Sequence, residues 1–256
     1  MTAVTLTVSR PLPANTTLVE TEPLRVLLAA APVALKNRRI ICVSGDSGCG
    51  KSVALDVLKH QLDVPVATVI LDRGSTDKQV IEEIYKAVHR QPGPMHSSIR
   101  KAEMMAHLRS TLANEQVVLM VDEAQNASLR ALELARQLHE DPTSRCGLIL
   151  SGVNLSEKTA KEPMLHSRIG MHVTFHPLTD GALIDVLRKL HPHLAALPDE
   201  LIFDIDDSYC RGGLRRWVVF LEWLLAVTGD GTRKPGRKDV EKALTIMTST
   251  APQLTP

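Results

Sequence analysis

The chain has 256 residues, of which 44% are hydrophobic and 23% are charged, and its formal net charge is +1 at pH 7. These values are ordinary for a globular protein that forms one large domain, or a large domain and a small one. A net charge near zero excludes a global basic field, so contacts with nucleic acid have to come from local basic patches. The four cysteines form no CxxC pair and no apolar run is long enough to span a bilayer, so we expect a cytoplasmic protein with reduced thiols and no membrane contact.

The first part of the chain alternates apolar strands with helices. Residues 1–20 are rich in Thr and Pro and predict an extended N-terminal arm. Strands are expected over Arg39–Val43, Val66–Asp72, Val117–Val121, Gly147–Leu150 and His172–Phe175, and helices over Glu20–Leu35, Ser52–Leu62, Asp77–His89, Ser98–Leu112 and Ser128–His139. Strands that are apolar throughout and separated by helices predict an α/β fold with a parallel sheet covered on both faces.

After Pro177 the strand patterns cease and only helical patterns follow. The helices are expected in the stretches TDGALIDVLRKL, PDELIFDI, GGLRRWVVFLEWLLAV and KDVEKALTIM. We therefore predict a core over residues 21–177, a small helical lid over 178–248 and a flexible tail over 249–256.

Residues Gly45–Ser52, GDSGCGKS, follow the apolar run IICVS and match the pattern GxxxxGK[ST] of the phosphate-binding loop. The glycines let successive backbone N–H groups converge on phosphate oxygens, and the helix that follows adds a favourable dipole. Lys51 is expected to reach the β- and γ-phosphates, and Ser52 is expected to bind Mg²⁺. The predicted nucleotide-binding residues are Gly45, Asp46, Ser47, Gly48, Cys49, Gly50, Lys51 and Ser52.

Asp122 and Glu123 close the third predicted strand. An aspartate at the C-terminal end of such a strand can hold Mg²⁺, and a glutamate beside it can polarise the attacking water. Without the loop upstream, these carboxylates would indicate only a solvated acidic strand end. With the loop, they favour nucleotide hydrolysis over a kinase, which does not need Glu123, and over an ABC-type ATPase, whose LSGGQ signature is absent.

Three later residues fit the same scheme. Asn154 follows the fourth strand and is placed to orient the attacking water, although a turn-forming Asn explains it too. Arg168 lies just before the fifth strand, where the phosphate of a neighbouring subunit could sit, and a surface arginine is its alternative. Arg215 follows two glycines and could reach back to the nucleotide, with Arg216 as its rival for that role.

The order of the motifs along the chain resembles that of an AAA+ ATPase. These motifs are the loop, VDEAQ, LARQLHED, LILSGVNL, LHSRIG with FHPLT, and GGLRRW. They look most like the MuB/TniB/TnsC-type ATPases that serve DNA transposition, over roughly residues 20–248. The first two motifs are generic, whereas RQLHED and HSRIGMHVTFHPLT point to this branch. The resemblance implies an AAA+ P-loop fold whose five-stranded parallel sheet has the order 5-1-4-3-2, followed by the helical lid.

The resemblance also assigns cofactors and roles. It implies ATP and Mg²⁺, with Ser52 and Asp122 as the metal ligands. Asp122 and Glu123 correspond to the Walker B pair, Asn154 to sensor 1, Arg168 to an arginine finger acting in trans, and Arg215 to sensor 2. The stretch LSGVNL departs from the commoner VGxxxL, which leaves Ser151 competing with Asn154 for the sensor-1 role.

Family behaviour implies an ATP-dependent homo-oligomer, a ring or a helical filament, that binds double-stranded DNA and marks target sites for a transposase. A target-selector protein is a further candidate partner. The candidate DNA contacts are His89, Arg90, Arg100 and Lys101, which flank the stretch QPGPMHSS, and a solvated loop with helix-capping charges explains these residues equally well. Alternative functions are a helicase loader, an ExeA-like ATPase, or a nucleotide-gated switch with little turnover.

Overall fold

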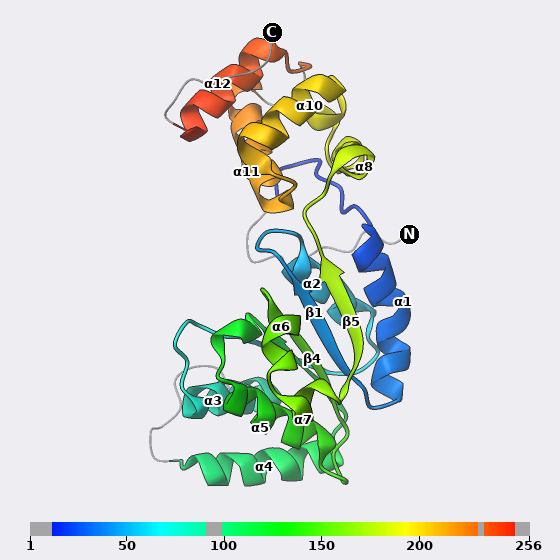
Figure 1. Ribbon diagram of the computed structural model, residues 1–256, viewed down its shortest axis with the longest axis vertical. Helices are drawn as coiled ribbons and strands as arrows, with labels where there is room; N and C mark the ends of the chain where they lie inside the picture. Colours follow the sequence, from blue (N-terminus) through cyan, green and yellow to red (C-terminus); the bar gives the residue numbers. More distant parts are fainter. Residues whose placement is uncertain (1–11, 91–98, 230–232, 249–256) are drawn as a thin grey trace. The chain divides into compact units, whose positions relative to one another are not determined.

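The computed structural model describes residues 12–90, 99–229 and 233–248 (Figure 1). These residues form two compact units. The first contains Pro23–Gly45 and Lys51–Phe175, and the second contains residues 12–22, Asp46–Gly50 and the described residues from 176 to 248. The stretch QPGPMHSS, the tail 249–256 and the first eleven residues of the predicted arm lie outside the described residues.

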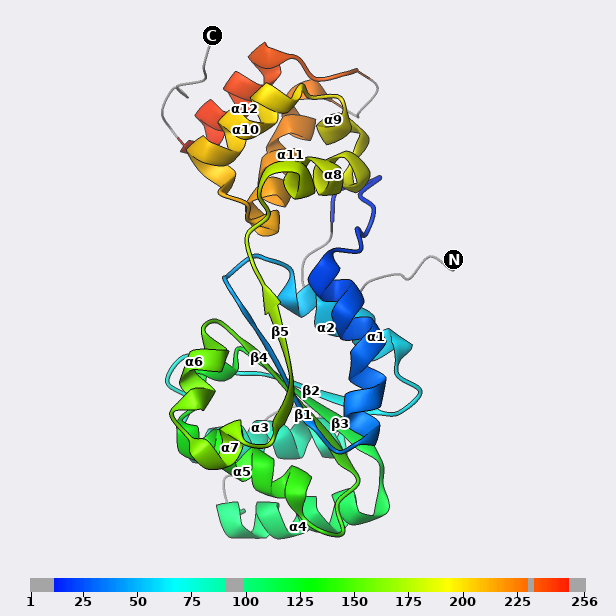
Figure 2. The same ribbon diagram turned by 45° about the vertical axis from the view of Figure 1, so that its right-hand side comes forward.

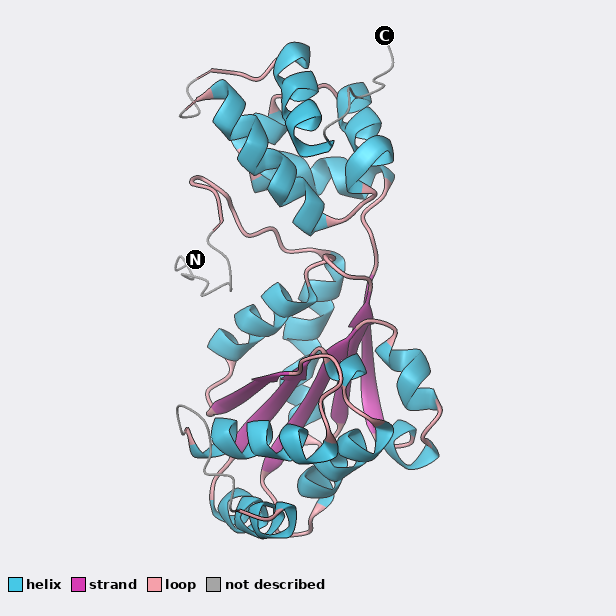
Figure 3. Cartoon of the chain, turned by 90° about the vertical axis from the view of Figure 1, so that its left-hand side faces the viewer, coloured by secondary structure: helices cyan, strands magenta, loops and turns pink. Residues whose placement is uncertain are grey.

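The first unit is built on a five-stranded sheet with the order β2-β3-β4-β1-β5, and all of its pairings are parallel (Figure 3). The strands are β1 (Ile40–Gly45), β2 (Val66–Ile70), β3 (Val117–Asp122), β4 (Cys146–Gly152) and β5 (Ile169–Phe175). The predicted α/β class, the parallel pairing and the strand order are confirmed. Because these strands are parallel, β1, which leads into the phosphate loop, and β3, which ends in Asp122, finish at the same edge of the sheet, with β4 between them.

Helices cover both faces of this sheet (Figure 1, Figure 2). They are α1 (Glu22–Lys36), α2 (Lys51–Gln61), α3 (Asp77–His89), α4 (Lys101–Asn114), α5 (Leu129–Glu140), α6 (Leu155–Ala160) and α7 (Pro163–His166), with a 3-10 turn at Ala124–Asn126. Alternate residues of the strands, such as Leu119 and Leu148, join the buried side chains of α3, α4 and α5 in one core. The opposite face carries α1 and α2. The short helices α6 and α7 were not predicted.

The second unit is helical. Its helices are α8 (Asp180–Leu190), α9 (Pro192–Ala195), α10 (Asp199–Ile205), α11 (Leu214–Thr228) and α12 (Arg237–Thr248), with a π-helix at Asp206–Cys210. The four predicted helices are confirmed, while α9 and the π-helix were not expected. A separate core surrounds the fully buried Trp217 and Phe220. Residues 12–22 belong to this unit, because the amide of Thr17 donates to the carbonyl of Leu190 at 2.8 Å.

Among the residues that the structure describes, no helix combines the length and the apolarity needed to cross a bilayer.

Candidate nucleotide-binding site

The glycines of GDSGCGKS occupy backbone conformations that side chains rarely adopt. Gly45 ends β1 with φ of +139°, and a Cβ atom there would lie 2.0 Å from the carbonyl oxygen of Phe175. Gly50 has φ of +102° directly before α2. Alanine or serine could not take either conformation without strain, which explains the glycines. Since glycine has no side chain, the backbone N–H groups of the loop are not covered at these positions.

Lys51 and Ser52 form the first turn of α2, immediately after the loop. Lys51 is 6% exposed, and its Nζ donates to the carbonyl of Gly45 at 2.7 Å, which folds the side chain back along the loop. The hydroxyl of Ser52 donates to Oδ2 of Asp122 at 2.7 Å, although the two residues are 70 positions apart in the chain. A hydroxyl and a carboxylate oxygen in contact are ligands of the kind that Mg²⁺ takes, so the donor set fits the predicted metal.

Glu123 leaves β3 in a left-handed conformation, with φ of +54°. Its amide donates to Oδ1 of Asp122 at 2.9 Å, so the two carboxylates are held in fixed relation to each other. The side chain of Glu123 is half-buried and accepts a hydrogen bond of 2.5 Å from Nε2 of Gln125. The backbone of Glu123 is therefore held at Asp122, and its side chain is held by Gln125.

Gln125 connects Glu123 to β4, although no sequence pattern had singled it out. Its Oε1 accepts from the amide of Val153 at 3.0 Å, while its Nε2 holds Glu123. Gly152 makes this possible, because a Cβ atom at that position would lie 2.2 Å from Oε1 of Gln125. The available signal was the polar residue two places after Glu123 in VDEAQ, but its partner Val153 lies in the turn after β4, 28 residues further along the chain.

The structure separates the two candidates for sensor 1. Ser151 lies inside β4 with no exposed surface, and its hydroxyl has no hydrogen-bond partner in the described part of the chain. Asn154 is exposed at the end of β4, has φ of +49° and begins α6. The hydroxyl of Ser44 accepts from the amide of Leu155 at 3.1 Å, which joins this turn to the end of β1. Of the two, Asn154 is the one that a bound molecule can reach.

Arg215 contacts the loop residues within the second unit. Its amide donates to the carbonyl of Gly48 at 3.0 Å, and its Nη1 lies 3.3 Å from the hydroxyl of Ser47. Arg216 is directed elsewhere, since its Nη1 donates to the carbonyl of Tyr209 at 2.9 Å. The geometry therefore favours Arg215 over Arg216 as the arginine that serves the loop.

Arg168 lies at the other edge of the sheet, directly before β5. Its side chain is 53% exposed, and its Nε lies 2.5 Å from Oε1 of Glu140. It directly precedes the seven residues of β5, and the last of these, Phe175, pairs with Gly45 of the loop. At about 3.3 Å per residue this strand spans roughly 20 Å, more than an arginine side chain can bridge. Arg168 therefore cannot reach a phosphate bound at its own loop.

The candidate DNA contacts lie at the end of α3 and at the start of α4. Arg90 and Arg100 are exposed, and Lys101 is half-exposed at the start of α4. His89 is different, because its Nδ1 lies 2.9 Å from the carbonyl of Tyr85 and its Nε2 lies 2.9 Å from the hydroxyl of Thr111. Both ring nitrogens of His89 thus face protein atoms and join α3 to α4.

Residues 34–158 match the model of a family described as AAA domain. This part of the chain is similar to an AAA domain. It contains the loop, both carboxylates, Gln125 and Asn154, whereas Arg168 and Arg215 lie beyond the match. No curated protein matches the sequence of the chain.

Solved structures of AAA+ proteins share the fold. Cdc6p from Pyrobaculum aerophilum is 20% identical with a TM-score of 0.71, over 90% of this chain and 68% of that one. The ORC2 protein of Aeropyrum pernix, in ADPNP–ADP complexes, is 14% identical with a TM-score of 0.66, over 93% of this chain and 69% of that one. The ORC1 protein of Aeropyrum pernix, in complex with DNA, is 17% identical with a TM-score of 0.65, over 92% of this chain and 68% of that one. At these identities the likeness establishes an AAA+ P-loop fold with a C-terminal helical region, and it does not distinguish the transposition branch from other AAA+ proteins.

Proposed function

We propose that this protein is an ATPase that assembles on double-stranded DNA with ATP and marks target sites for a transposase. The proposed ATPase activity is supported most directly by the contact of Ser52 with Asp122 and by the hydrogen bond from the amide of Glu123 to Asp122. A loop with Lys51 at its end supplies phosphate binding, and the carboxylates supply metal binding and activation of water. ADPNP and ADP in the neighbouring ORC2 structure support a nucleotide at this site.

Each residue then has a defined role. Backbone N–H groups of Gly45–Gly50 and the ammonium of Lys51 bind phosphate oxygens. Ser52 and Asp122 hold Mg²⁺, which neutralises charge on the phosphates when it is bound. Glu123 accepts a proton from the attacking water, and Asn154 orients that water. Arg215 contacts the loop as sensor 2.

Arg168 completes the site of a neighbouring copy. Because it lies about 20 Å along β5 from its own loop, it serves a γ-phosphate only across a subunit interface. Such an interface is head-to-tail, so it generates a ring or an open helical filament. ATP binding and assembly are then coupled, since the γ-phosphate bridges two subunits.

The proposal also includes double-stranded DNA and a transposase as partners. Arg90, Arg100 and Lys101 provide positive charge where α3 ends and α4 begins, and phosphate contacts need only such donors. Since His89 is engaged within the protein, we place the DNA contacts on the other three residues. The motifs RQLHED and HSRIGMHVTFHPLT support the transposition branch through their resemblance. The AAA+ neighbour solved with DNA supports DNA as a partner, and we keep the cytoplasm as the expected location.

ATP turnover with and without duplex DNA tests this proposal. We expect DNA to stimulate hydrolysis by the unchanged protein, and Lys51→Ala to abolish both nucleotide binding and turnover. Lys59→Ala, an exposed lysine on the same helix, is the matched control and should behave as the unchanged protein. Tight ATP binding by Lys51→Ala would contradict the loop assignment. ATP hydrolysis that ignores DNA would favour the ExeA-like alternative, and absence of turnover would favour the nucleotide-gated switch.

The helicase-loader alternative is the second candidate, because the likeness to Cdc6p and ORC proteins does not single out the transposition branch. A transposition assay separates the two functions. Addition of this protein with ATP should change where a partner transposase inserts its DNA, whereas a loader would leave the insertion sites unchanged.

A further inference from the structure

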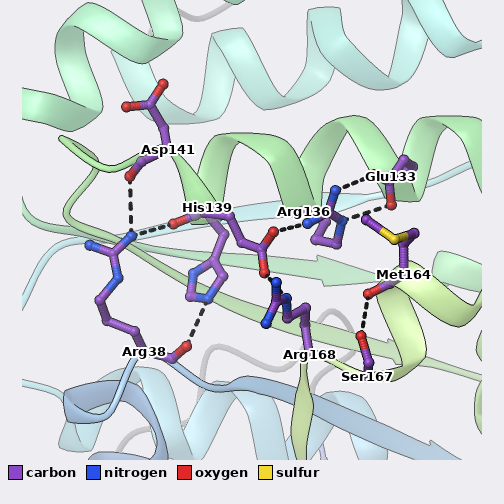
Figure 4. A network of polar contacts seen from close by, with 9 residues as sticks. Arg38, Glu133, Arg136, His139, Asp141, Met164, Ser167 and Arg168 are labelled. Carbon is purple, nitrogen blue, oxygen red and sulfur yellow. Dashed lines mark hydrogen bonds and ion pairs between the residues drawn. The ribbon is translucent and has the colours of Figure 1, made fainter.

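Three connections meet at the edge of the sheet opposite the nucleotide loop (Figure 4). They are the residues before β1, the end of α5 before β4, and Arg168 before β5. Because β4, β1 and β5 are neighbours in the sheet, the segments that enter them lie side by side. The end of α5 is the motif LARQLHED, Leu134–Asp141, which has no role in the proposed function as stated above.

Backbone contacts fix the end of α5 at this edge. The guanidinium of Arg38 donates to the carbonyls of His139 at 2.7 Å, Asp141 at 3.2 Å and Ser144 at 2.5 Å. His139 is 2% exposed, and its Nδ1 lies 2.7 Å from the carbonyl of Cys146, the first residue of β4. The last turn of the helix is therefore attached both to the segment before β1 and to β4.

A row of alternating charges runs along α5 and ends at Arg168 (Figure 4). Arg136 is 7% exposed, donates a hydrogen bond to Glu133 on one side and forms an ion pair with Glu140 on the other. The hydrogen bond from Arg136 lowers the pKa of Glu133, and the same contact raises the pKa of Arg136. Glu140 in turn contacts Nε of Arg168 at 2.5 Å. Glu140 is thus shared by two guanidinium groups, one buried and one exposed.

Glu140 contacts Arg168 at Nε of the guanidinium, and the side chain of Arg168 nevertheless remains 53% exposed. The contact restricts the rotation of the side chain, while its exposed surface stays accessible to an incoming anion.

We propose that Glu140 is a positioning residue for Arg168, and that Arg136 holds Glu140 in place. The pair orients the guanidinium toward the γ-phosphate of the neighbouring subunit, which reduces the side-chain entropy lost when the interface forms. This inference rests on the proposed function of Arg168 as a finger in trans. In LARQLHED, Arg136 and Glu140 then position the finger, and His139 anchors the helix that carries them.

Steady-state ATPase measurements on oligomers of Glu140→Ala test the inference. We expect kcat to fall by about 10- to 100-fold, the range seen when a supporting residue behind a functional group is removed, with KM for ATP unchanged. Glu140→Gln keeps an oxygen acceptor for Nε and should lose less. Glu115→Ala, which removes an exposed carboxylate at the end of α4, is the control and should keep the full kcat.

Mixing subunits shows which site has lost its finger. Lys51→Ala keeps Arg168 and Glu140 but cannot hydrolyse ATP itself, so adding it to Glu140→Ala should restore turnover at shared interfaces. A structural defect within the Glu140→Ala subunit would not be restored in this way. If Glu140→Ala misfolds, the isosteric Glu140→Gln gives the same mixing readout.

The outcomes distinguish this inference from the function on which it rests. A full or raised kcat for Glu140→Ala, while Arg168→Ala is inactive, would overturn the positioning role and leave the finger intact. Failure of Lys51→Ala to restore turnover would also overturn it. Normal hydrolysis by Arg168→Ala would instead remove the finger itself, and the proposed function in trans with it.

Discussion

At the scale of single residues, Glu123 is the side chain on which hydrolysis depends most directly. Glu123→Gln keeps the size of the side chain and leaves Ser52 and Asp122 in place, so we expect ATP to bind with unchanged affinity. Loss of the general base should slow turnover by about 10²- to 10⁴-fold. Nucleotide binding by calorimetry and turnover by phosphate release would measure the two effects separately. Unchanged turnover would assign the base to another residue.

Gln125 is the residue that orients Glu123. Gln125→Leu removes both the donor to Glu123 and the acceptor for the amide of Val153, so the catalytic carboxylate loses its fixed position. We expect kcat to fall by roughly 10-fold with little change in KM, as is typical for a supporting residue. Gln61→Leu, at the exposed end of α2, is the matched control. A Gln125→Leu variant as active as the control would show that Glu123 needs no such support.

The sequence indicated some of these residues and missed others. Lys51, Ser52 and Asp122 could be predicted because the loop pattern and the strand end are local, and the structure brings Ser52 and Asp122 into contact. Gln125 and Glu140 were not expected, because their partners are distant in the chain: Val153 follows β4 and Arg168 precedes β5. The predicted sheet order brings these strands together, but it does not show which side chains beside them make contact.

At the scale of elements, apolar strands and capped helices were the easiest to predict. The bounds of α3 match the prediction, because Thr76 and Gln79 form a capping box before it and Arg90 ends it in a left-handed conformation. All six residues of β3 are buried, which explains its uninterrupted apolar run. The helices α7 and α9 have four residues each, too few for a helical period to show in the sequence.

The turn before α11 depends on Gly212. This residue has φ of +69°, and a Cβ atom there would lie 2.4 Å from the carbonyl oxygen of Leu178. Its amide also donates to the carboxylate of Asp206 at 2.8 Å, which accepts from the indole of the buried Trp217 at 2.9 Å. The sequence showed the two glycines of RGGLRRW, but it did not show what fills the space beside them.

We expect Gly212→Ala to destabilise the protein by about 1–3 kcal/mol, because it adds both backbone strain and a clash with the Leu178 carbonyl. Thermal or urea unfolding would measure the loss. Gly181→Ala is the control, since a Cβ atom at that position meets nothing within 4 Å. Equal stability of the two variants would show that the turn relaxes freely.

At the scale of the whole molecule, the sheet places the loop and Arg168 at opposite edges. The loop, Asp122 and Glu123 lie at the carboxyl ends of the strands, and Arg168 lies where β5 begins. Under the proposed function, a subunit with this arrangement would complete its site only by contact with a second copy, in a head-to-tail interface. Weak DNA contacts repeated in each subunit then add up along the array.

We therefore expect ATP, and not ADP, to drive assembly on duplex DNA with little preference for sequence. Binding should weaken steeply with salt, because each phosphate contact releases counterions. Changing Arg90 and Arg100 together to Glu should abolish DNA binding and spare ATP binding, since both side chains are exposed at the ends of α3 and α4. The same change of charge at Lys59 and Arg188, exposed elsewhere, is the control. Sedimentation and electron microscopy with ATP, ADP or no nucleotide, each with and without DNA, would measure assembly. A protein that stays monomeric with ATP and DNA would contradict the role in transposition, and only the ATPase would remain.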